Sequence, residues 1–97
     1  MEASVATDLK CQRCGAEFFL PAVPNDIKGN VSAIARGVGR VNAILELKNR
    51  TNIGLSDAKA IAFHLSEGDT CHRCGTELTR ESPIQHCPKC RSLNLLW

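Results

Sequence analysis

The sequence predicts a small α+β domain in which a central helical segment lies between two cysteine-containing modules. Three observations lead to this fold class. The chain has only 97 residues and contains six cysteines, and chains this short often need a cross-link or a metal for stability. The cysteines form three C-x-x-C pairs, at 11–14, 71–74 and 87–90. Between them, residues 25–68 lack cysteine and carry apolar residues at helical spacing.

These features divide the chain into three parts. Residues 1–24 form a leader and an N-terminal cysteine knuckle, residues 25–68 form the helical segment, and residues 69–97 form the second cysteine module. In the first part, residues 1–10 are expected to be a frayed leader. The apolar run 18–20 follows the first cysteine pair, and Pro21 and Pro24 end that run because proline cannot continue regular pairing.

The helical segment is expected to contain two to three helices. Asn25 or Asp26 is placed to cap the first, and Ser56 is placed to cap the third. Glycines at 37 and 39 end the first helix, and the second runs from about Arg40 to Arg50. The predicted apolar stripes are Ile27, Val31, Ile34 and Val38, then Val41, Ile44, Leu45 and Lys48 with Leu47 beside them, and finally Ala58, Ile61, Ala62 and Leu65.

The C-terminal cysteines have the spacing of a metal site. Two C-x-x-C pairs are separated by twelve residues, and zinc takes four such thiolates in a tetrahedron. Gly75, directly after the first pair, permits the left-handed residue that ends such a turn. The sequence therefore predicts one structural Zn²⁺ bound by Cys71, Cys74, Cys87 and Cys90. His72 and His86 adjoin these ligands and are expected to lie beside the site rather than in it.

The expected cellular location of the protein also favours metal binding over disulfide bonds. The first ten residues, MEASVATDLK, contain two acids and no apolar run, unlike a secretory signal. No window approaches the roughly 18 apolar residues of a membrane span. The expected location is therefore the reducing cytoplasm, where paired cysteines bind metal.

The stretch CHRCG…CPKCRSLNLLW resembles a zinc ribbon, a β-hairpin module of many transcription and translation proteins. The resemblance covers about 27 residues and implies a hairpin held by zinc. Its tail SLNLLW is expected to form a strand, with Trp97 packed against the domain, because a small module needs its large apolar side chains buried. Ribbons contact DNA, RNA and proteins alike, so the fold leaves the type of partner open.

The stretch GRVNAILELKNRTNIGLSDAKAIAFHL resembles the helical hairpin in the C-terminal domain of the bacterial ribosomal stalk protein. In that family the hairpin presents lysines and apolar residues to translation factors. The resemblance implies a partner-binding surface at Lys48, Gly54, Leu55 and Lys59. Leu45 and Ser56 stand where the family has further lysines.

The first pair, Cys11 and Cys14, has no partner pair beside it in the sequence. Four arrangements are open. In the first, the pair binds a second zinc together with His64, near the end of the third helix, and another histidine or cysteine. It meets the same pair of a second copy, giving a homodimer. It stays free as two thiols. Or it replaces one C-terminal pair, although loop-closure entropy favours the short pairing.

The predicted function is that of a non-catalytic zinc-binding interaction or adaptor protein, in a translation or transcription setting. The net charge is +2, and a four-thiolate zinc site of about −2 brings the metal-bound chain close to neutral.

The alternative is a nucleic-acid-binding ribbon, supported by basic residues at 27–50 and by Arg73, Arg80, Lys89 and Arg91. The chain has only four aromatic residues, which leaves few side chains for bases to stack on and counts against this alternative. An enzyme is not expected, because four thiolates close the zinc site.

Overall fold

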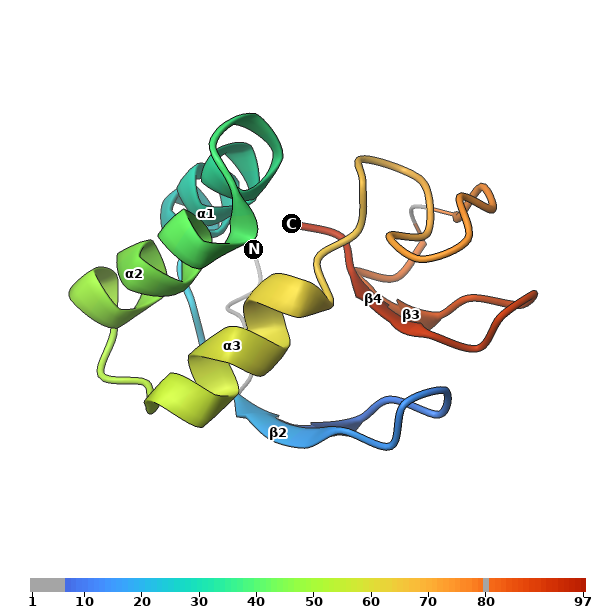
Figure 1. The fold of residues 1–97 in the computed structure, drawn as a ribbon, viewed down its shortest axis with the longest axis horizontal. Coiled ribbons are helices and arrows are strands. Elements are labelled where there is room, and N and C mark those ends of the chain that lie inside the picture. The colour runs from blue at the N-terminus through green and yellow to red at the C-terminus, as the bar shows by residue number, and fades with distance from the viewer. Residues whose placement is uncertain (1–6, 80) are drawn as a thin grey trace.

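The computed structural model describes residues 7–79 and 81–97. Its elements, in chain order, are β1 (Thr7–Lys10), β2 (Glu17–Leu20), α1 (Asn25–Gly37), α2 (Arg40–Arg50), α3 (Leu55–Phe63), β3 (Ile84–His86) and β4 (Leu93–Leu95). The strands form two antiparallel hairpins, β1–β2 and β3–β4, beside the three helices (Figure 1). The small α+β fold with a central helical segment is confirmed.

The N-terminal hairpin begins inside the segment expected to be a leader. Residues 1–6 lie outside the described residues, but residues 7–10 form β1, so the expectation of a frayed end is wrong for them. Register explains the pairing, since Leu9 lies opposite Phe18. Along β2 the side chains alternate, with Phe18 and Leu20 buried and Phe19 exposed. Backbone pairing with β2 thus orders a segment that has no strong strand signal of its own.

The first two helices pack together, and the predicted stripes are confirmed in part: Ile27 and Ile34 pack half-buried against the core, and Ile44 is buried in it. In α1, Val31 is buried as expected, whereas Val38 lies beyond the helix and is 71% exposed. The buried residues of α2 are Ala43, Ile44 and Leu47. Val41 and Leu45, in the predicted stripe, are 66% and 55% exposed. The face of α2 that packs against the core is therefore the one that carries Ala43, Ile44 and Leu47. Val41 and Leu45 point toward solvent.

The third helix buries the predicted stripe. Ala58, Ile61 and Ala62 are fully buried, and Leu65 is buried just past the helix, where it bridges to Leu95 of β4. The predicted caps are wrong. Ser56 lies inside α3, which starts at Leu55 after Gly54, and α1 starts after Pro24. In neither helix does a side chain cap the first turn.

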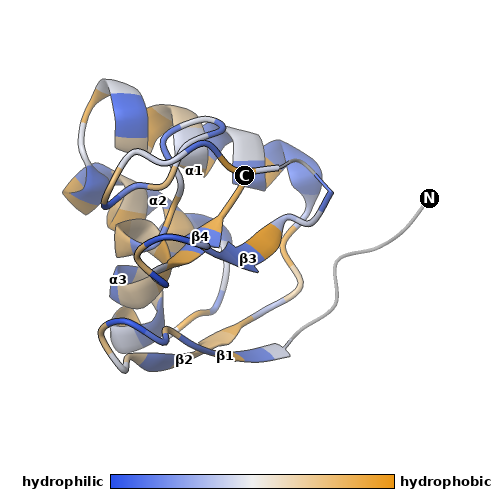
Figure 2. Cartoon of the chain, turned by 90° about the vertical axis from the view of Figure 1, so that its right-hand side faces the viewer, coloured by the Kyte–Doolittle hydropathy of each residue, from blue (hydrophilic) through white to orange (hydrophobic). Residues whose placement is uncertain are grey.

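Strand β4 belongs both to the C-terminal hairpin and to the main core. It pairs with β3, and its Leu93 and Leu95 are buried in the same cluster as the helical residues. Trp97 packs against that cluster, and the Lys28 ammonium lies 5.9 Å from its ring centre. The strand and the packed tryptophan expected for SLNLLW are confirmed. Figure 2 shows the two hairpins one above the other, with the helices to one side.

Arg40 joins α2 to the end of α3. Its guanidinium donates hydrogen bonds to the carbonyl of Ala62 and, at 3.2 Å, to that of Leu65. It also pairs with Glu67 at 2.7 Å, and its side chain is only 21% exposed. A cation at a helix C-terminus satisfies carbonyls that lack partners in the helix and opposes the negative end of the helix dipole. This arginine therefore acts inside the fold.

Replacing Arg40 with alanine is expected to lower the free energy of unfolding by about 2 kcal/mol, because two backbone carbonyls lose charged donors. Urea unfolding of the zinc-loaded chain, followed by circular dichroism, measures the loss. Arg50→Ala is the matched control. Its guanidinium lies 3.8 Å from Glu46 on the same helix and its side chain is 45% exposed, and helix pairs of this kind contribute well under 1 kcal/mol. Equal stability of the two variants would contradict the role of Arg40.

Candidate metal centres

All three cysteine pairs fold into the same turn. In each, the N–H of the first cysteine donates to the carbonyl five residues on, and its carbonyl accepts from the N–H four residues on, at 2.8–3.0 Å. The turn ends in a left-handed residue, and the three residues at that place are Gly15, Gly75 and Arg91, with φ of 78°, 80° and 68°. Glycine adopts this conformation without strain. Arg91 shows that the turn forms even where the sequence lacks its glycine.

The C-terminal centre brings four sulfurs together. Cys71, Cys74, Cys87 and Cys90 place their sulfur atoms within 4.8 Å of one another. Across the two turns, the Cys71 and Cys90 sulfurs are 3.6 Å apart and those of Cys74 and Cys87 are 3.5 Å apart. Four thiolates around one point suit tetrahedral zinc. Replacement of one of these pairs by the N-terminal pair does not occur in the structure.

Electrostatics at this centre also favour a cation. Hydrogen bonding from the amide of Cys90, and then of Lys89, lowers the pKa of Cys87 to about 6. Burial, with contributions from the neighbouring sulfurs, raises the pKa of Cys90 to about 11. Sulfurs this close do not all ionise unless a positive charge lies between them. A Zn²⁺ ion bound here would supply that charge and displace the remaining protons.

Asn94 on β4 supports the C-terminal centre from behind, and sequence reasoning missed it. Its side chain is fully buried. The Asn94 Nδ2 donates to the Cys71 sulfur at 3.4 Å, and its Oδ1 accepts the N–H of His72 at 3.0 Å. Hydrogen bonds of this kind orient metal ligands. The available signal was a single amide inside the apolar run SLNLLW, since a buried amide needs partners.

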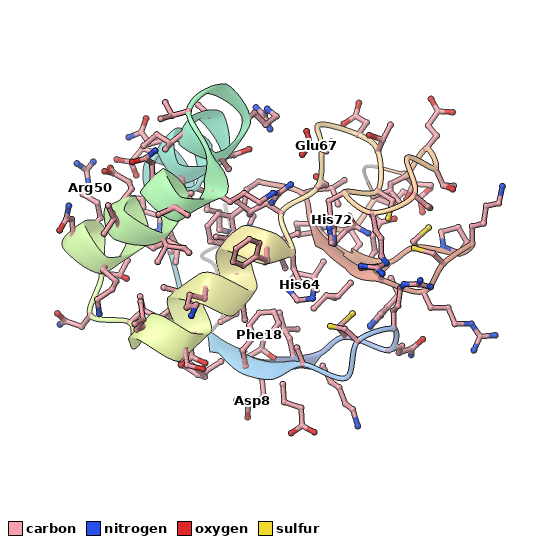
Figure 3. The ribbon with its side chains drawn as sticks, viewed as in Figure 1. Asp8, Phe18, Arg50, His64, Glu67 and His72 are labelled. Carbon is pink, nitrogen blue, oxygen red and sulfur yellow. The ribbon has the colours of Figure 1, made fainter. Side chains whose placement is uncertain are left out.

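The N-terminal centre consists of Cys11, Cys14 and His64, whose ligand atoms also lie within 4.8 Å of one another. His64 follows α3, and its Nε2 is 3.5 Å from the Cys14 sulfur. Its ring stacks on Phe18 with ring centres 5.3 Å apart. Figure 3 shows both rings between α3 and the N-terminal hairpin. Of the four arrangements that the sequence left open, this geometry favours the one in which His64 joins the N-terminal pair. No fourth cysteine, histidine or carboxylate within residues 7–79 and 81–97 joins the group.

The state of the His64 ring suits metal binding. Its Nδ1 is 2.7 Å from the carbonyl oxygen of Ala60. A carbonyl only accepts, so Nδ1 carries the proton, and in the neutral ring the Nε2 lone pair is left facing Cys14. A histidine with one nitrogen held by a carbonyl and the other bare is the usual form of a zinc ligand. The residues present therefore fit a Cys₂His zinc site.

Cys11 is the buried ligand of this centre. Its sulfur accepts hydrogen bonds from the N–H of Cys14 at 3.5 Å and from the N–H of Leu93, on the distant strand β4, at 3.4 Å. Burial alone would raise the pKa of Cys11, but the amides of Cys14, Leu93 and Arg13 outweigh it and hold that pKa at about 6. The backbone thus stabilises a thiolate, the form that binds metal.

His72 and His86 lie beside the centres without joining them, as expected. The His72 Nε2 is 3.0 Å from the carbonyl of Leu93 and 3.1 Å from the Ser92 hydroxyl. Burial lowers the pKa of His72, which favours the neutral ring. The His86 Nε2 lies 3.0 Å from the carbonyl of Lys10 and so contacts the N-terminal hairpin.

The residues predicted to bind a partner lie away from both metal centres. Lys48, Gly54, Leu55 and Lys59 are all exposed. They belong to the end of α2, the following turn and the start of α3. The Lys48 ammonium also donates to the carbonyl of Ile53 at 3.3 Å, closing this turn.

No family model, curated protein or solved structure matches this chain. In the part of the chain that the structure describes, every helix is too short or too polar to span a bilayer.

Proposed function

We propose that this chain is a non-catalytic zinc-binding interaction protein, in which two zinc centres hold both hairpins against a helical segment that binds a protein partner. Metal binding is supported by the close approach of seven potential ligand atoms, which form two groups. The four-thiolate centre has a complete coordination shell of protein ligands, which is typical of structural zinc.

The partner surface in this proposal is the exposed face of α2 with the start of α3. Val41, Leu45 and Lys48 follow one another at positions i, i+4 and i+7, so they share one face of the helix. Val41 and Leu45 are more than half exposed, and so is Leu55 at 54%. Grouped exposed apolar side chains mark interaction sites.

Charge indicates the kind of partner. Lys48 and Lys59 are exposed beside these apolar residues. Complementary charge sets which partner is accepted. We therefore expect an apolar segment flanked by acidic residues. A translation or transcription setting in the cytoplasm remains part of the proposal and rests on the resemblances to zinc ribbons and to the ribosomal stalk hairpin.

Nucleic-acid binding is the competing function. Its support in residues 27–50 is weakened by the contacts of those side chains within the fold. Lys28 lies over Trp97, Arg36 donates to Ser32, and Arg40 binds the end of α3. In the ribbon, Arg73, Lys89 and Arg91 are exposed, while Arg80 lies outside the described residues. Binding to RNA or DNA with a steep salt dependence would favour this function instead.

Site-specific photo-crosslinking in native cells tests the proposal. A photoreactive amino acid at Leu45 is expected to give a discrete protein adduct, which disappears when Val41→Glu is added. Val41 is 66% exposed, so glutamate there leaves the fold intact while placing a charge in the surface. The same photoreactive residue at Lys89, in the ribbon, is the control. Adducts to nucleic acid from Lys89, with none from Leu45, would contradict the proposal.

A further inference from the structure

The two centres share one cleft. A cavity of about 690 Å³ is lined by Cys14 and His64 of the N-terminal centre and by Cys74 and Cys90 of the C-terminal centre. Cys11 does not line this cavity: it is fully buried, and its sulfur accepts the N–H of Leu93. A metal held by these three ligands therefore has Cys11 behind it and Cys14 and His64 in the cleft wall.

The N-terminal centre offers one ligand fewer than zinc takes. Zinc is four-coordinate in proteins, and a site with three protein ligands leaves one position for water or another molecule. His72 also lines the cleft, but its Nε2 is occupied by the Leu93 carbonyl and the Ser92 hydroxyl. Since the protein ligands lie behind the metal or in the wall, the remaining position faces the cleft.

The cleft also contains two arginines at equivalent places. Arg13 and Arg73 are the third residues of CQRC and CHRC, and both line the cavity. Both are exposed, and neither guanidinium forms a hydrogen bond or ion pair with the described residues. No aspartate or glutamate lines the cavity. Their free donors are suited to oxygen atoms of an anion.

The two arginines differ in the charge of the metal centre beside them. Arg73 belongs to a knuckle of the four-thiolate centre. With zinc bound, that centre carries about −2, which offsets the positive charge of Arg73. The equivalent Arg13 adjoins two thiolates and a neutral histidine, which with Zn²⁺ sum to about zero. One anionic ligand on the metal would give this centre the negative charge that Arg13 lacks.

We infer that the metal of the N-terminal centre takes a small oxyanion, a phosphate or a carboxylate, at its fourth position, with Arg13 as the main second contact. The inference rests on the proposed binding of a second metal at Cys11, Cys14 and His64. The anion would exchange with water, because nothing in the described residues covers the cleft side of the metal.

Cadmium NMR of the full chain loaded with Cd²⁺ tests this inference. Cadmium binds thiolate sites well, and two resonances are expected, one of which is lost in His64→Ala and is thereby assigned. Sodium phosphate and sodium acetate are titrated separately at constant ionic strength, set with sodium perchlorate. The assigned resonance should shift saturably with at least one anion, while the four-thiolate resonance stays in place.

Variants make the test specific. Arg13→Ala should raise the anion concentration at half-saturation about tenfold, the effect of losing one charged hydrogen bond, and Arg50→Ala on α2 should leave it unchanged. Two resonances that respond to neither anion would overturn the oxyanion site while leaving two metals in place. An unchanged half-saturation in Arg13→Ala would overturn the role of Arg13. A single resonance in the unmodified chain would instead refute the second metal, and this inference with it.

Discussion

Replacing Cys87 with serine is expected to release the zinc of the C-terminal centre and to unfold the helical segment together with the C-terminal hairpin. Cys87 is a buried member of the four-sulfur group. Structural zinc contributes about 10–16 kcal/mol of apparent binding free energy, whereas a small domain is stable by only about 5–15 kcal/mol. Weakening the metal therefore removes free energy comparable with the whole stability of the domain.

The loss spreads because β4 belongs to both parts of the molecule. Leu93 and Leu95 are buried among helical residues and lie at most five residues after Cys90. When the C-terminal hairpin opens, these leucines leave the core, and each buried leucine contributes roughly 2 kcal/mol. Because His64 follows α3, unfolding of the helices also displaces a candidate ligand of the N-terminal centre. Native mass spectrometry should therefore show at least one zinc fewer per chain, and circular dichroism should show reduced helix content.

Lys89→Ser is the matched control for Cys87→Ser. Lys89 lies in the same turn and is exposed. Only its backbone N–H contacts the Cys87 sulfur, and that contact survives the substitution. This control should keep the full zinc content and helicity. If Cys87→Ser did the same, the four sulfurs would not be holding a structural metal.

Replacing His64 with alanine is expected to remove the second zinc while the four-thiolate centre keeps its own. The zinc count per chain should fall from about two to one, because the N-terminal centre keeps only two thiolates. The N-terminal hairpin also loses the stacking of Phe18 on His64. Hydrogen exchange of the β1–β2 amides should rise by at least about tenfold, with smaller changes in the helices.

Two further variants separate metal binding from packing at this position. His64→Cys supplies a different zinc ligand and should restore the second metal, although it cannot restore the ring contact with Phe18. His86→Ala removes another histidine near the N-terminal hairpin, whose Nε2 lies 3.0 Å from the Lys10 carbonyl, and should leave the zinc count unchanged. A normal zinc count in His64→Ala would show that His64 is a packing residue and not a ligand.

The sequence predicted core positions best where the helix has one apolar face. In and just after α3 all four predicted residues are buried, because the other positions of this helix are mostly polar or small. In α2, apolar residues cover two faces of the helix. The face with Leu47 is buried, and the face with Val41 is exposed. Periodicity cannot choose between two faces when the choice depends on neighbouring helices. Strand β1 was missed because its order comes from pairing with β2.

The metal centres were predictable to the extent that ligand spacing is local. The C-x-x-C turns carry their geometry in four or five adjacent residues, so the four-cysteine group followed from spacing. His64 lies 50 residues from Cys14, and the sequence left it as one of several alternatives. The contacts from Leu93 and Asn94 could not be predicted, since they depend on where β4 docks.

The contact between Leu93 and Cys11 has a consequence for how the protein is made. The two residues are 82 positions apart, so the N-terminal knuckle is synthesised long before the amide that completes its surroundings. Until then the Cys11 thiol is exposed, and contacts of such long sequence separation form late in folding. Metal added to the nascent chain therefore reaches an unfinished first centre, which closes only after β4 has left the ribosome and docked.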